Sequence, residues 1–200
     1  MKKNKRKTVI IILVVLAIVA AMFLFLRLSG AAFTVRGVSK YEKYFGENGE
    51  HRKNGLTESA IFPKSLPPSA KVEKFVYRHE DLMDPSDAAV LVYTCSKEDY
   101  EKELARLLTA LGTEPEDIYG VYGISGFPYE AVAAEADETT GVIYAMTEPE
   151  ACRFIYVENT HCNYFSDIRY PWYIGKKYLP SGYDAMPGNP VREAFETNTN

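Results

Sequence analysis

The sequence predicts an α+β fold: an N-terminal transmembrane helix, then a mostly antiparallel sheet covered by one amphipathic helix. Two observations carry this prediction. An unbroken apolar run from Val9 to Leu26 is long enough to cross a bilayer, since its 18 residues would rise roughly 27 Å as a helix. Farther along, the order becomes strand, strand, helix, strand, strand, strand. The last three are joined by short turns, which favour antiparallel pairing.

The apolar run has more than one interpretation. Five cations lie among the seven residues before it, as in a cleaved secretory signal, and Ser29-Gly30-Ala31 is compatible with cleavage. The apolar stretch of such signals, however, is only about 7 to 15 residues long. A buried helix of a soluble protein rarely stays apolar on every side. We therefore predict an uncleaved anchor over residues 8–28, with a cleaved signal as the alternative.

The charges on either side of the run predict its orientation. Cations near a span favour the cytoplasmic side, and the N-terminal flank holds five within seven residues. The other flank has four, spread over seventeen residues: Arg27, Arg36, Lys40 and Lys43. We expect residues 1–7 to form a cytoplasmic tail. The protein should then be a single-pass protein of the cell membrane with an extracytoplasmic C-terminal domain.

The part beyond the anchor is acidic. Six of the 23 cations lie in residues 1–27, which contain no Asp or Glu, so 17 cations stand against 27 acids in the rest, a net charge of about −10. Nucleic acid and anionic lipid surfaces are poor partners for such a domain, because both bind clustered Lys and Arg. Solubility is the simplest consequence of this charge.

A tether and one folded domain are expected after the anchor. Residues 29–60 are charged and punctuated by glycine, so we expect a tether and a loosely ordered lead-in. Within it, Tyr41 to Phe45 is suited to a turn of helix that docks on the domain. The remaining chain suffices for one domain with its own core. We place that domain at residues 61–195.

The elements of the domain follow from local patterns. Strands are expected at Lys71 to His79, Ala88 to Cys95, Tyr129 to Ala136, Val142 to Thr147 and Cys152 to Glu158. The helix begins after Ser96, an N-cap residue with Asp99 three positions on, and ends at Gly112. Apolar residues recur along it at helical spacing, so it should lie on the sheet. From Tyr164 the chain should run irregularly over the surface.

Reactive side chains are present, but no familiar motif joins them. A cysteine nucleophile needs a neighbouring imidazole, and none of the three histidines stands in a recognisable motif with Cys95, Cys152 or Cys162. An odd number of cysteines excludes complete internal pairing. A Cys152–Cys162 bridge and buried free thiols both remain open. His161-Cys162 lacks the repeated short spacing of a zinc site. We predict no catalytic residue, no metal and no cofactor.

One segment is a candidate binding surface. Seven aromatic residues lie between Tyr164 and Tyr183, among them the only tryptophan of the chain. Exposed aromatic rings stack on sugars and anchor protein partners. Tyr170, Trp172 and Tyr173 are therefore the candidate ligand-binding residues. The alternative is that this segment wraps the sheet and buries its rings in the core.

A resemblance to known proteins rests on a few short segments. They are Ile61-Phe62-Pro63, Asp84-Pro85, Ala88 with Val90-Leu91-Val92-Tyr93-Thr94-Cys95, and Lys97-Glu98-Asp99-Tyr100-Glu101. This pattern resembles a group of uncharacterised bacterial proteins that have a basic start, one membrane helix or lipid anchor, and an exported domain. The resemblance implies a bacterial extracytoplasmic protein. It brings no activity and no functional residue.

Three functional hypotheses result. The leading one is a non-catalytic, membrane-anchored extracytoplasmic module that contacts an envelope protein or a wall glycan, with no nucleic-acid partner. Its alternative is a cell-envelope enzyme, a hydrolase whose carboxylates are assembled only by the fold. The third makes the membrane helix itself the contact surface, through Ala17 and Ala21 at small-xxx-small spacing.

Overall fold

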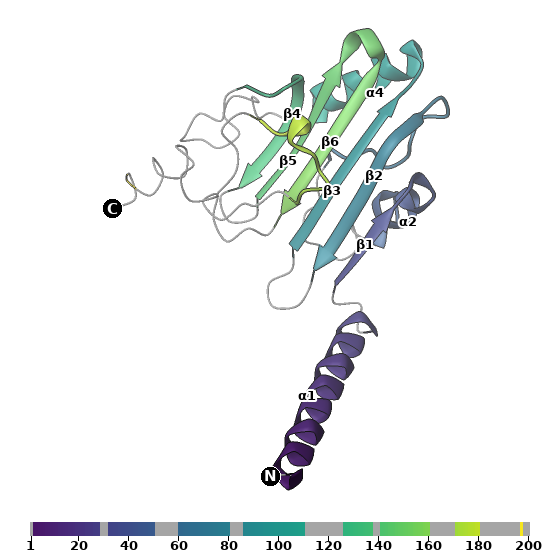
Figure 1. Ribbon diagram of the computed structural model, residues 1–200. Coiled ribbons are helices and arrows are strands. Elements are labelled where there is room, and N and C mark those ends of the chain that lie inside the picture. Colours follow the sequence, from purple (N-terminus) through teal and green to yellow (C-terminus); the bar gives the residue numbers. More distant parts are fainter. Residues whose placement is uncertain are drawn as a thin grey trace.

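Figure 1 shows the computed structural model of the protein. The structure describes residues 2–28, 32–50, 60–80, 86–110, 126–137, 141–160, 171–180 and 197. One long helix stands apart from a domain built on a six-stranded sheet with strand order β1-β2-β3-β6-β5-β4. Every neighbouring pair of strands is antiparallel. The predicted α+β class and antiparallel sheet are thus confirmed.

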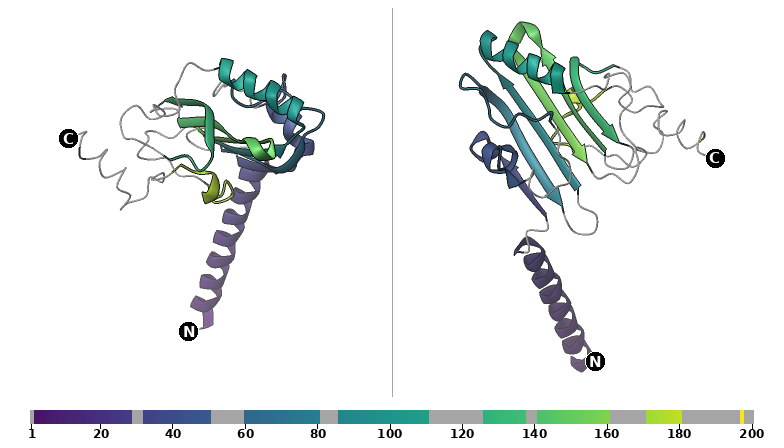
Figure 2. Two further views of the ribbon diagram at one scale, coloured as in Figure 1. Left: turned by 90° about the horizontal axis from the view of Figure 1, so that it is seen from above. Right: turned by 180° about the vertical axis from the view of Figure 1, so that it is seen from behind.

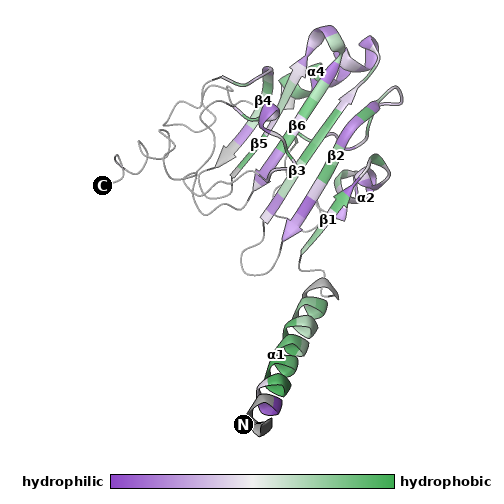
Figure 3. Ribbon diagram, in the orientation of Figure 1, coloured by the Kyte–Doolittle hydropathy of each residue, from purple (hydrophilic) through white to green (hydrophobic). Residues whose placement is uncertain are grey.

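The long helix is α1 (Lys2–Leu28). Its segment Arg6–Phe25 is long and apolar enough to cross a membrane, and none of it is buried in the protein. Figure 3 colours most of α1 hydrophobic and shows a hydrophilic turn near its N-terminal end. A signal sequence near the N-terminus would have the same length and composition. Its length and composition are thus those of a membrane anchor or of such a signal.

Five of the strands lie within two residues of the predicted ones. They are β2 (Lys71–Glu80), β3 (Ser86–Thr94), β4 (Glu130–Asp137), β5 (Gly141–Glu148) and β6 (Arg153–Thr160). Three antiparallel pairs join strands that are consecutive in sequence and separated by short connections, as expected. The pairing of β3 with β6 crosses a long stretch of chain and places these two strands in the middle of the sheet.

The sixth strand, β1 (Ala32–Arg36), lies in the range expected as a tether. It pairs with β2 at one edge of the sheet, with Ala32 opposite Glu80 and Arg36 opposite Val76. Phe33 and Val35 pack on one face of the sheet, so residues alternate between faces as in any half-buried strand. A run of only five residues gives too short a pattern to identify from sequence.

One face of the sheet, the aromatic face, carries large rings. Its strands contribute Phe75, Tyr77, Leu91, Tyr93, Phe154 and Tyr156, all buried. Helix α2 (Tyr41–Phe45) packs there with three buried rings, so the turn of helix expected at these positions is present. The segment 60–63 and helix α4 (Lys97–Ala110) lie on the same face, with Tyr100 and Leu107 of α4 buried in the aromatic cluster. Figure 2 shows α4 on this side of the sheet.

On the opposite, aliphatic face, the described chain that closes the sheet is largely irregular. Its strands contribute mainly valine and isoleucine, such as Val90, Val142 and Ile155. Residues 171–180, which we call the strap, cross this face and bury Tyr173, Ile174 and Tyr178. The strap includes the short 3-10 helix η5 (Lys176–Tyr178). Elsewhere in the described residues, 3-10 turns form at η1 (Val38–Lys40) and η3 (Pro149–Ala151).

Candidate functional site

The predicted binding residues lie at the start of the strap, where the structure separates them. The side chain of Trp172 is 81% exposed, whereas Tyr173 is only 7% exposed and belongs to the core of the aliphatic face. The two neighbouring rings meet edge to face at 6.1 Å. Tyr170 lies outside the described residues. Trp172 is therefore the aromatic residue of this set that the described surface presents to solvent.

The strap is held in place by side chains of the sheet. Lys74 Nζ donates a hydrogen bond to the carbonyl of Ile174 at 3.1 Å, and the hydroxyl of Tyr144 donates one to the carbonyl of Tyr178 at 2.9 Å. Between these two points Gly175 has φ +92°, a left-handed conformation that glycine adopts without strain. These two hydrogen bonds and the three buried side chains of the strap hold the backbone next to Trp172 against the sheet.

Three cations from three different elements lie near two aromatic rings of the strap. The guanidinium carbon of Arg36 lies 5.8 Å from the centre of the Trp172 ring. The amines of Lys74 and Lys177 lie 5.6 and 4.7 Å from the centre of the Tyr178 ring. At such distances, the negative face of an aromatic ring attracts a cation. We call Arg36, Lys74, Lys177 and Trp172 the cationic patch.

The cations of this patch are close enough to influence one another. Burial lowers the pKa of the Lys74 amine, and the positive charges of Lys177 and Arg36 lower it further. No pattern in the sequence links positions 36, 74 and 177, because β1, β2 and the strap become neighbours only in the folded sheet. Sequence reasoning therefore found the tryptophan and missed the charges beside it.

A second polar cluster lies inside the aromatic face, near the ends of β2 and β6. One carboxylate oxygen of Asp87 accepts a hydrogen bond from the Tyr77 hydroxyl at 2.7 Å and contacts Nδ1 of His79 at 2.9 Å. Glu158 lies on the same face, opposite Ala89. Burial, together with the negative charge of Asp87, raises the pKa of Tyr77, so its hydroxyl acts as a donor. Among the described residues, this cluster brings two acidic side chains and a histidine onto one face of the sheet.

The carboxylates of this cluster do not face the solvent. Asp87 is 1% exposed and Glu158 is 0% exposed. Hydrolysis of a glycosidic bond needs two carboxyl groups on either side of a substrate, with room for water. Here both acids lie among the buried residues of the sheet, so their arrangement supports folding more directly than catalysis.

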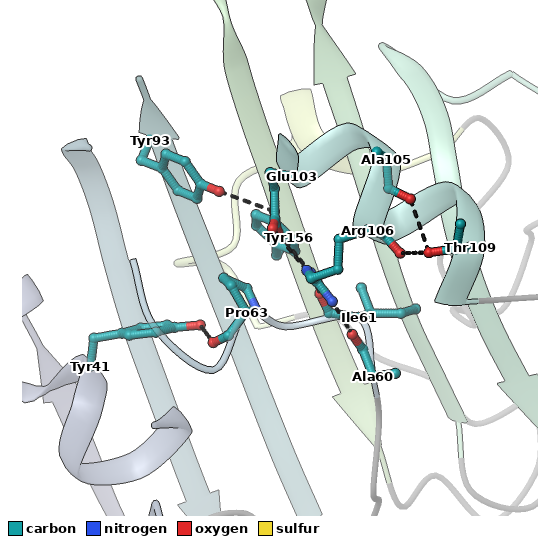
Figure 4. A network of polar contacts seen from close by, with 10 residues as sticks. All are labelled: Tyr41, Ala60, Ile61, Pro63, Tyr93, Glu103, Ala105, Arg106, Thr109 and Tyr156. Carbon is teal, nitrogen blue, oxygen red and sulfur yellow. Dashed lines mark hydrogen bonds and ion pairs between the residues drawn. The ribbon is translucent and has the colours of Figure 1, made fainter. Parts of the chain in front are cut away.

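A third network joins α4 to the segment before β2 (Figure 4). Arg106 forms an ion pair with Glu103 at 2.6 Å and donates hydrogen bonds to the carbonyls of Ala60 and Ile61 at 2.5 and 2.7 Å. The hydroxyl of Tyr156 donates to Glu103 at 2.5 Å. Burial raises the pKa of Tyr156 well above its usual value, which keeps this donor protonated. The network fastens residues 60–61 to the helix.

The cysteines lie in an arrangement that the sequence did not indicate. Cys95 and Cys152 are neighbours at the ends of β3 and β6, where the backbone N–H of Cys95 donates to the carbonyl of Cys152 at 3.0 Å. Both are free thiols and half-buried. Burial, and secondarily Cys152, raises the pKa of Cys95 to about 11, so little nucleophilic thiolate forms at neutral pH. Cys162 and His161 lie outside the described residues.

Within the described part of the chain, no group of three or more His, Cys, Asp or Glu side chains lies close enough together to hold a metal ion. No protein-family model matches the chain, and comparisons with curated proteins and with solved structures give no significant match. The geometry of the three clusters is therefore the basis for inferring a function.

Proposed function

We propose that this chain is a non-catalytic, membrane-anchored module that contacts another component of the cell envelope through the surface around Trp172. In this proposal α1 crosses the cell membrane, residues 1–7 remain in the cytoplasm and the sheet domain lies outside. An envelope protein and a wall glycan are the components that the sequence suggested. The observation that carries the proposal is the 81% exposure of Trp172 on the strap, with Arg36 beside its ring and Lys74 and Lys177 at the ring of Tyr178.

The orientation follows from charge and not from the domain itself. Five cations precede the apolar helix within seven residues, and cations near a span favour the cytoplasmic side. An exposed apolar helix of this length is unfavourable in water, and none of the described residues buries Arg6–Phe25. The same proposal gives α4 the role of an amphipathic cover for the aromatic face, with Tyr100 and Leu107 inward and charged residues outward.

A hydrolase remains the second candidate, because His79 and Asp87 form a close pair near Glu158. A histidine held by a carboxylate is a common part of a catalytic site. The two acids, however, are buried and Asp87 already accepts a hydrogen bond from Tyr77. The binding module accounts for the exposed tryptophan, whereas the hydrolase assigns it no role.

Photocrosslinking in intact cells tests the proposal. A benzoylphenylalanine residue in place of Trp172 is expected to capture one envelope component reproducibly. The same residue in place of Lys102, on the exposed side of α4, serves as the matched control and should not capture that component. Trp172→Ala should fold normally, since substitutions of exposed residues change stability by only about 0.5 kcal/mol.

Two results would count against the module. One is identical capture from positions 172 and 102, which would show that no specific contact forms at the strap. The other is hydrolysis of wall fragments by the purified full chain that disappears in Asp87→Asn and persists in Trp172→Ala. That second result would favour the hydrolase.

A further inference from the structure

The cationic patch is a local exception to the acidity of the domain. Neither β1 nor the strap contains an Asp or Glu, and the first acid of the chain is Glu42. Arg36, Lys74 and Lys177 come together on this surface, and the exposed Lys176 lies next to Lys177 in the strap. The net charge predicted from the sequence therefore does not describe this side of the molecule.

The patch is also close to the membrane helix along the chain. Only three residues separate Leu28, the end of α1, from Ala32, the start of β1. Eight residues at about 3.5 Å each limit the distance from Leu28 to Arg36 to about 28 Å, even if the chain is fully extended. Figure 2 shows that α1 leaves the domain on the side of the sheet that carries the strap, away from α4.

The composition of the patch is typical of residues that lie at a membrane surface. Tryptophan is enriched at the level of the lipid headgroups, where its ring is partly buried and its N–H can donate a hydrogen bond. Arg and Lys near the surface are attracted to anionic lipids, and this attraction acts over a Debye length of about 10 Å. The strap offers both interactions, since its exposed Trp172 lies beside Arg36 and its Tyr178 lies beside Lys74 and Lys177.

We propose that the cationic patch docks on the anionic phospholipid headgroups of the membrane that α1 crosses. This inference rests on the proposed function and names the envelope component that Trp172 contacts. Docking turns the strap face of the sheet toward the lipid. It leaves α4 on the side that faces away from the membrane, where its exposed charged residues remain in water.

Trp172 is the only tryptophan of the chain, so its fluorescence reports on the patch without any substitution. The full chain is placed in nanodiscs of phosphatidylcholine alone or of phosphatidylcholine mixed with phosphatidylglycerol. In the anionic discs we expect a blue-shifted emission, quenching by a lipid labelled near its headgroup, and at least about a twofold drop in quenching by acrylamide. Added salt should reverse these changes, because it screens surface charge.

Matched charge reversals test the role of the cations. Arg36→Glu combined with Lys177→Glu should abolish the difference between the two kinds of disc. Lys97→Glu combined with Lys102→Glu changes the net charge equally but lies on α4, so it should preserve that difference. Folding of both variants is checked by circular dichroism.

Several results would overturn the inference. They are a water-exposed Trp172 in both kinds of disc, an equal shift in neutral and anionic discs, or a shift that survives in the Arg36/Lys177 variant. If Trp172 stays water-exposed in discs while position 172 captures a protein or a glycan in cells, the inference fails and the proposed function stands. If the discs give the expected shift but residues 171–180 prove cytoplasmic in cells, the proposed topology is wrong.

Discussion

The two faces of the sheet are closed in different ways. On the aromatic face, α2, the segment 60–63 and α4 contribute buried side chains that pack with those of the strands, and partly buried hydrogen bonds join α4 to this layer. The aliphatic face is closed by the strap, whose backbone is held by one lysine and one tyrosine of the sheet. The aromatic face thus resembles an ordinary core, whereas the strap face combines a small core with an exposed surface.

This difference shows where function can be placed at little cost to folding. Acidic residues on the aromatic side of the sheet already form internal contacts: Asp87 accepts a hydrogen bond from Tyr77, and Glu103 forms an ion pair with Arg106. On the strap, Trp172 and Lys177 project outward while their neighbours Tyr173 and Tyr178 are buried. Binding residues often lie on loops positioned by a rigid scaffold.

The largest expected effect is on the aromatic face. Phe45 is 1% exposed and its ring lies 4.8 Å from that of Phe62 and 5.1 Å from that of Tyr77. Phe45→Ala should lower the free energy of unfolding by about 3–5 kcal/mol, since it leaves a cavity among packed rings. Urea denaturation of the full chain, followed by near-ultraviolet circular dichroism, measures this loss.

Leu108→Ala is the control for Phe45→Ala, because Leu108 is 60% exposed. It should change the unfolding free energy by no more than about 0.5 kcal/mol. Equal effects of the two substitutions would contradict the packing described for α2.

A smaller effect is expected at the Arg106 network. Arg106→Met removes the ion pair with Glu103 and the hydrogen bonds to Ala60 and Ile61, and leaves the Glu103 carboxylate, which is 11% exposed, without its cation. The expected loss is about 1–3 kcal/mol, the range for depriving a buried polar group of its partner. Lys102→Met breaks an exposed ion pair with Glu98 on the same helix and should leave the denaturation midpoint unchanged.

A still smaller loss of unfolding free energy is expected on the strap face. Tyr144→Phe removes the hydrogen bond to the carbonyl of Tyr178 and leaves the ring in the core. We expect a loss of about 1 kcal/mol, typical of one neutral hydrogen bond. Faster hydrogen exchange of the strap amides than of the β3 amides would show that the strap is released first. An unchanged strap would mean that its buried side chains alone hold it.

The smallest effect concerns pH. Hydrogen bonds from Ser69 lower the pKa of Asp99 below its usual value, chiefly through the Ser69 hydroxyl at 2.5 Å. A carboxylate with a lowered folded pKa stabilises the protein above its unfolded pKa of about 3.9, and this contribution is lost as pH falls through the folded value. Ser69→Ala should therefore be less stable than the wild type at pH 6. The difference should shrink below about pH 4, and a constant difference would contradict the assignment.

Most strands of the sheet could be predicted, because each has a recognisable pattern of apolar residues and is bounded by turn residues. Ala88 to Cys95 is apolar at every position but one, as befits a strand with both faces covered. The helix after Ser96 has its cap in place, since Ser96 Oγ accepts a hydrogen bond from the N–H of Asp99 at 3.3 Å. These signals lie within a few residues of the element that they define.

Contacts between distant residues could not be predicted. β6 returns to pair with β3, and this pairing alone places Cys152 beside Cys95 and Tyr156 beside Tyr93. A strand register follows from packing of the whole sheet and not from the sequence of either strand. The cationic patch depends in the same way on the strap crossing β2 near the edge strand β1.

In the proposed topology, α1 separates the basic N-terminus from a sheet domain on the outer side of the membrane. Intact cells treated with a membrane-impermeant amine reagent test it directly, using native lysines on both sides of α1 and mass spectrometry to locate the label. The proposed topology predicts labelling of Lys97 and Lys102 on the exposed side of α4, with Lys2, Lys3, Lys5 and Lys7 labelled only after the membrane is permeabilised. Labelling of the N-terminal lysines in intact cells, with Lys97 and Lys102 protected until permeabilisation, would contradict it.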